Sequence, residues 1–84
     1  MEYINFYDWL VNVNGMSERS AKDVISRCRR VLQITKQNEI KSSTINILIS
    51  STEFSNCSMS IKSQLKRAAT LYMTFSENMN PQED

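Results

Sequence analysis

The sequence contains no histidine, one glycine and one proline among its 84 residues. Without histidine there is no imidazole for general acid–base catalysis and no ligand set typical of zinc sites. A single glycine cannot form the glycine-rich loop that cradles phosphates in nucleotide-binding enzymes. The acidic residues are scattered, and no serine–lysine pair stands out as a catalytic dyad. We therefore expect no enzymatic activity from this chain alone, and no metal, other cofactor or small-molecule substrate.

Long apolar runs are also missing. No run approaches the roughly 18 residues needed to cross a bilayer, and the start at Met1–Tyr3 lacks the positive charge and apolar stretch of a signal peptide. The two cysteines, Cys28 and Cys57, form no CxxC pair, and a cytosolic setting favours free thiols. These features predict a cytoplasmic protein without a membrane partner.

The apolar residues that are present, 40% of the chain, recur at helical spacing. Eighty-four residues make one small domain, close to the lower limit for burying a core without covalent help. Short connections between the amphipathic segments favour an all-α, four-helix bundle over residues 1–78, followed by a flexible tail or linker at 79–84. The helices are expected at about residues 5–14, 17–35, 43–51 and 59–77.

Capping residues predict where the helices begin and end. Asn5 is expected to cap the first helix, with Ile4 and Trp9 at the spacing of a hydrophobic staple. Gly15 should end this helix in a left-handed conformation. Ser17 should cap the second helix. The expected apolar face of the first helix is made of Phe6, Trp9, Leu10 and Val13.

The third segment permits two interpretations. Ile45 to Ile49 is rich in β-branched residues and is compatible with a strand. No second strand-like segment exists to pair with it, so a helix capped by Ser42 or Ser43 is preferred. Residues 50–58 are expected to form a loop, with Phe54 folded back onto the core.

The fourth segment, capped by Ser58 or Ser60, has a long apolar stripe. Its aromatic residues Tyr72 and Phe75, like Phe6 and Trp9 of the first helix, are expected in the core and not as platforms for bases. Exposure of Leu71 and Met73 would instead mark a contact with another domain or subunit. The stripe consists of Ile61, Leu65, Ala68, Tyr72 and Phe75.

Positive charge is concentrated in two segments. Residues 17–36 hold six lysines and arginines against two acids, and residues 60–76 hold three against none, so the rest of the chain is acidic. Surface helices often carry such charges only for solubility, but these faces lack the interspersed acids that would form i,i+4 pairs. A basic surface with serine and threonine is typical of nucleic-acid binding. The candidate DNA-binding residues are Arg19, Lys22, Ser26, Arg29, Arg30, Lys62, Ser63, Lys66, Arg67 and Thr70.

The order of these features resembles the N-terminal core-binding domain of tyrosine recombinases, the phage-type integrases. The resemblance covers residues 3–81 and includes Asn80–Pro81, which is similar to the linker into the catalytic domain. The later part of the pattern is matched by Ile45 to Ile49 and by Ala68-Ala69-x-x-Tyr72-x-x-Phe75. The earlier part is matched by Phe6, Trp9, Leu10, Gly15, Met16, Ser17 and Ser20.

The resemblance implies a SAM-like bundle whose second and fourth helices grip duplex DNA in the major groove. The recombinase catalytic domain is absent from this sequence, so strand cleavage is not expected of it. The chain would be either a fragment of a longer recombinase or a stand-alone relative from a phage or mobile element. Its partners would be double-stranded DNA and, in the first case, a catalytic domain or other recombinase subunits.

A different class of function also fits a small helical domain. SAM-like bundles serve protein contacts as well as DNA, so the alternative is a stand-alone protein-interaction or regulatory domain without catalytic activity. Such a domain would bind its partner through an apolar patch, and replacing Arg29 and Arg30 would matter little.

Overall fold

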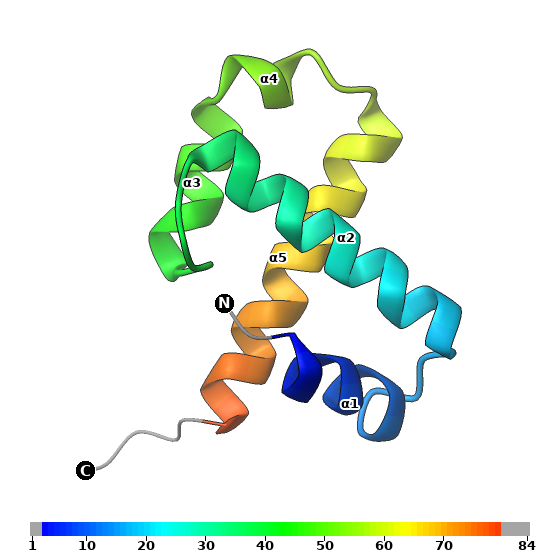
Figure 1. Ribbon diagram of the computed structural model, residues 1–84. Coiled ribbons are helices and arrows are strands. Elements are labelled where there is room, and N and C mark those ends of the chain that lie inside the picture. Colours follow the sequence, from blue (N-terminus) through cyan, green and yellow to red (C-terminus); the bar gives the residue numbers. More distant parts are fainter. Residues whose placement is uncertain (1–2, 80–84) are drawn as a thin grey trace, which may run out of the picture.

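The structure, a computed structural model that describes residues 3–79, is built from helices (Figure 1). The predicted all-α class is confirmed. Within these residues there are five helices where four were expected, because the segment 50–58 includes a one-turn helix. The helices are α1 (Ile4–Asn12), α2 (Glu18–Thr35), α3 (Ser42–Ser50), α4 (Thr52–Ser55) and α5 (Met59–Met79). The expected tail at 79–84 lies, beyond Met79, outside the described residues.

The first helix differs from its prediction at both ends. It begins at Ile4 after Tyr3, whose side chain makes no capping hydrogen bond, so the assignment of Asn5 as N-cap was wrong. Ile4 is 68% exposed and does not form the expected staple. The helix stops at Asn12, which leaves Val13 70% exposed and off the apolar face.

The start of α2 follows the sequence prediction, whereas Gly15 has the expected conformation but does not end α1, whose C-cap residue is Val13. Gly15 has a φ of +75°, the left-handed conformation that a glycine adopts without a Cβ clash. The Ser17 hydroxyl then accepts a hydrogen bond from the Ser20 N–H at 3.2 Å, which caps α2 as expected. α2 ends at Thr35, and its C-cap residue Lys36 has a φ of 58°, in the left-handed region.

The third segment is a helix, and its start is fixed by a buried hydroxyl group. The Thr44 hydroxyl accepts from the Lys41 N–H at 2.8 Å and donates to the side-chain oxygen of Gln37. Lys41 is therefore the N-cap residue, in place of the predicted Ser42 or Ser43. Because Thr44 is fully buried, both bonds avoid the cost of an unpaired polar group in the core.

Phe54 and the start of α5 behave as expected. Phe54 lies in α4 and is 5% exposed, so the residue does return to the core. The Ser58 hydroxyl accepts from the Ile61 N–H at 3.3 Å, which identifies Ser58 and not Ser60 as the cap of α5.

The core is organised around the crossing of α2 and α5, the most extensive helix–helix contact in the molecule (Figure 1). Ala68 and Ala69 are almost completely buried, and the Cys28 thiol donates to the Ala68 carbonyl at 3.4 Å. Two alanines in α5 permit this close approach because their side chains are single methyl groups. Leu71 and Met73 are only partly exposed and pack against the core, so they are not the fully exposed pair that the predicted contact would require.

An aromatic cluster joins α1 to the far half of α5. The Phe6 ring is fully buried between Tyr72 and Phe75, with ring centroids 5.0 and 5.2 Å away. Trp9 is half-buried, and its ring centroid lies 5.9 Å from that of Phe75. Aromatic pairs at these separations stabilise a core beyond the area that they bury.

Truncation of Phe6 should therefore be severe. We expect Phe6→Ala to lower the free energy of unfolding by about 3–5 kcal/mol, measured by chemical denaturation followed by circular dichroism. Val13→Ala, which shortens an exposed side chain at the end of the same helix, should change it by less than about 0.5 kcal/mol. Equal losses in the two variants would contradict the described packing of α1.

The two thiols should differ in reactivity. Burial raises the pKa of the Cys28 thiol to about 12, so at pH 8 a disulfide reagent should modify the half-buried Cys57 first and Cys28 only after unfolding.

The raised pKa of Cys28 should also make stability depend on pH. In the unfolded chain the thiol has its lower, ordinary pKa, so between the two pKa values the unfolded chain has lost the Cys28 proton while the folded chain keeps it. Stability should therefore fall as pH rises towards 12, and more steeply than in Cys28→Ala.

Candidate nucleic-acid interface

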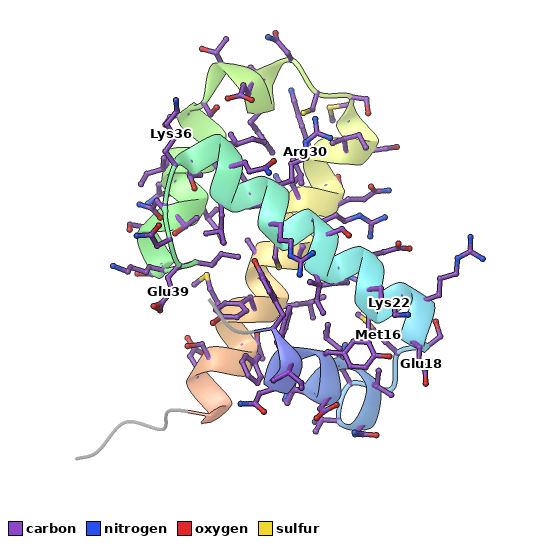
Figure 2. All side chains as sticks on the ribbon, viewed as in Figure 1. Met16, Glu18, Lys22, Arg30, Lys36 and Glu39 are labelled. Atoms are coloured by element: carbon purple, nitrogen blue, oxygen red, sulfur yellow. The ribbon has the colours of Figure 1, made fainter. Side chains whose placement is uncertain are left out.

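The outward side of α2 bears an exposed row of polar and basic residues. It lies opposite the buried side chains that meet α5, such as Ala21 and Cys28. Figure 2 shows Lys22 and Arg30 placed along this helix, and the row from Arg19 to Arg30 spans about 16 Å. The exposed residues of this row, here named the α2 face, are Arg19, Lys22, Ser26, Arg29 and Arg30.

One side of the α2 face is bordered by a groove towards the start of α5. The groove has a volume of about 240 Å³, and Ile61 and Leu65 of α5 form its apolar wall. The residues from α2 that line it are Asp23, Ser26, Arg27 and Arg30.

Arg27 is the residue that sequence reasoning missed in this groove. It is half-buried, between the outward and the buried sides of α2, and a division of the helix into two faces therefore leaves it out. Arg27 lies three residues before Arg30, and residues at i and i+3 lie on the same side of a helix. This spacing could have identified Arg27 from the sequence as a neighbour of Arg30.

The other side of the α2 face is bordered by a hollow towards α1, with a volume of about 590 Å³. This α1 hollow is mostly apolar. Its basic residues lie on α2, where the Arg29 guanidinium carbon is 4.9 Å from the centroid of the Tyr3 ring, a cation–π contact. The residues that line it are Tyr3, Ile4, Tyr7, Lys22, Ile25, Ser26 and Arg29.

The two tyrosines of the hollow have different electrostatic surroundings. Burial raises the pKa of Tyr3, and the nearby Arg29 charge partly offsets this shift. Burial also raises the pKa of Tyr7, but there the carboxylates of Glu18 and Asp8 add to the shift.

The predicted residues of α5 form a second exposed group. Lys62 differs from them because it is half-buried, with its Nζ 5.8 Å from the centroid of the Phe54 ring. The remaining residues, here named the α5 face, are Ser63, Lys66, Arg67 and Thr70, and all are exposed.

The packing of α2 on α5 separates the two faces. Each helix buries the side that meets the other, with Cys28 of α2 against Ala68 of α5. The exposed sides therefore point away from their common contact, in a molecule that measures 34 × 34 × 17 Å. The structure brings the α2 face together as one continuous row, and it places the α5 face on the other side of the crossing.

The described residues offer little other chemistry. Among residues 3–79, no group of three or more histidine, cysteine, aspartate or glutamate residues is placed to hold a metal ion. In the same part of the chain, no helix has both the length and the apolar character to cross a membrane. Comparison with known proteins found no matching family model, curated protein or solved structure.

The distinct setting of Lys62 leads to a stability prediction. Lys62→Ala should lower the free energy of unfolding by about 0.5–1 kcal/mol, because it removes both the contact with the Phe54 ring and the packed aliphatic stem. Lys66→Ala, one turn further along α5 and exposed, is the matched control and should be nearly neutral. Thermal denaturation of both variants tests this, and an equal effect would argue against the Phe54 contact.

Proposed function

We propose that this protein is a duplex DNA-binding module with a SAM-like helical arrangement, as the resemblance to recombinase core-binding domains implies, but one that grips the duplex with α2 and not with α2 and α5 together. The observation that supports the proposal best is the α2 face, where four exposed cations share one side of one helix with an exposed serine. Cations in such a row neutralise backbone phosphates, and a hydroxyl group can contact either phosphates or base edges.

The dimensions of DNA favour α2 as the element that enters the groove. The major groove is about 12 Å wide and admits a single α-helix. In this proposal α2 lies in the groove, with Ser26 at the centre facing the bases and the arginines on either side reaching the phosphates. Arg27 and Arg30 lie on the side of α2 that faces α5 and would contact the phosphates of one DNA strand. Lys22 and Arg29 lie on the side that faces α1 and would contact the phosphates of the other strand.

The α5 face has a lesser role in this arrangement. Because it lies across the crossing from the α2 face, Lys66 and Arg67 would not share the same groove. The charges of Lys66 and Arg67 would contribute to the long-range attraction between the protein and DNA. This attraction depends on the overall electrostatic field of the protein and is screened by salt.

The affinity should depend steeply on salt. Each phosphate neutralised contributes about −0.9 to the slope of log K against log salt concentration, so five cations of α2, with Arg27 included, predict a slope of about −4.5. Fluorescence anisotropy with a labelled duplex, titrated at several salt concentrations, measures this slope. The absence of binding at low salt would refute the proposal.

Point substitutions test which surface binds. Arg30→Ala should weaken binding at low salt about fivefold to tenfold and reduce the slope by about one, because one phosphate contact is lost. Asp23→Asn should strengthen binding, since it removes the carboxylate that lines the same groove as Arg27 and Arg30. Opposite effects of two exposed substitutions cannot arise from a general loss of folding.

Lys41→Ala is the matched control for charge. Lys41 is an exposed cation at the start of α3, away from the α2 face, and its backbone N–H still bonds to Thr44 in the variant. The variant should bind DNA within about twofold of the unmodified protein, since distant charges are screened. A loss equal to that of Arg30→Ala would show a response to net charge alone and would contradict binding through α2.

A further inference from the structure

The α1 hollow has a composition that phosphate binding does not explain. Its lining is mostly apolar and includes Tyr3, Ile4, Tyr7 and Ile25, and the side chain of Ile4 is 68% exposed. Covering an isoleucine at the edge of an apolar hollow with a second apolar group lowers the free energy, because apolar surface is removed from water. A phosphate backbone offers no such group.

The charged residues of the hollow restrict its occupant further. Lys22 and Arg29 are the charged side chains that line it, and both are cations on α2. A phosphate backbone could pair with these cations but would leave the apolar lining uncovered. A peptide can instead place an apolar side chain in the hollow and its acidic residues only beside Lys22 and Arg29.

We propose that the α1 hollow is a docking site for an acidic amphipathic segment of a partner protein, which inserts a leucine or phenylalanine beside Ile4 and pairs its carboxylates with Lys22 and Arg29. This inference goes beyond DNA binding and does not depend on it, although Lys22 and Arg29 belong to both proposed surfaces, so the peptide and the duplex should compete for them. Helical segments that lay an apolar face into a groove are a common mode of peptide recognition. The cations on the rim select an acidic partner over a basic one.

The exposed apolar residues of the chain itself make a second copy a poor occupant. Ile47 and Ile49 are exposed on α3, but this helix has no charged residue to pair with Lys22 or Arg29. Met59 is exposed beside serines, with Lys62 as the nearest charge in α5. Ile4 and Val13 are exposed at the two ends of α1, but this helix has a single acidic residue, Asp8, against the two cations of the hollow. None of these segments combines an apolar anchor with two acidic neighbours.

The test uses two synthetic helical peptides with the same leucine and phenylalanine stripe. One has glutamate beside the stripe, and in the other glutamine replaces each glutamate, which removes the charge while keeping the shape. Fluorescence anisotropy with the labelled peptides should show saturable binding of the glutamate peptide to the unmodified protein and clearly weaker binding of the glutamine peptide.

Two variants locate the binding. Ile4→Ser should weaken the glutamate peptide about tenfold, the loss expected when one apolar side chain is no longer covered. Val13→Ser replaces an equally exposed apolar residue at the other end of α1, outside the hollow, and should leave peptide binding unchanged. Ile4→Ser should also leave duplex DNA affinity within about twofold, whereas Arg30→Ala should weaken DNA and not the peptide.

Several results would overturn the inference. They are the absence of saturable peptide binding, equal binding of the two peptides, or equal losses in Ile4→Ser and Val13→Ser. A loss of DNA affinity in Ile4→Ser as large as that in Arg30→Ala would assign the hollow to the duplex interface. Self-association in analytical ultracentrifugation that Ile4→Ser abolishes would assign it to a second copy. A failure of DNA binding alone would leave the peptide result standing.

Discussion

The close contact between α2 and α5 is the constraint on which the rest of the structure depends. At Cys28 and Ala68 a small thiol meets a methyl group, and the two backbones approach closely enough for the thiol to reach a main-chain carbonyl. A longer side chain at Ala68 would push the helices apart and open the core around it. The aromatic cluster of α1, and Phe54 from α4, then close the core on either side of this crossing.

The same contact determines how charge is distributed. Because each helix turns its apolar stripe towards the other, the cations of α2 and those of α5 are directed to opposite sides of the pair. Two basic faces that are similar in sequence thus differ in their surroundings. The α2 face has a hollow on each flank, one apolar and one with polar residues, and Ser26 lines both.

This arrangement gives one helix two kinds of neighbouring surface. Towards α5, arginines and an aspartate lie beside an aliphatic wall, which suits contacts with charged and polar groups. Towards α1, tyrosines and isoleucines predominate, with Lys22 and Arg29 at the edge. The two proposed surfaces share Lys22, Ser26 and Arg29, whereas Ile4 lines only the hollow towards α1 and Arg30 only the groove towards α5.

Helical periodicity and capping are local properties, so four of the helices, the Ser17 cap and the inward stripes of α2 and α5 were predictable from the sequence. The one-turn helix α4, the caps of α1 and α3 and the choice of Ser58 over Ser60 required the fold. Val13 is exposed because α1 ends at Asn12, just before it, and Lys62 is half-buried because Phe54 returns from α4. The relative direction of the two basic faces also required the fold, since a stripe shows which side of a helix is buried but not where its partner lies.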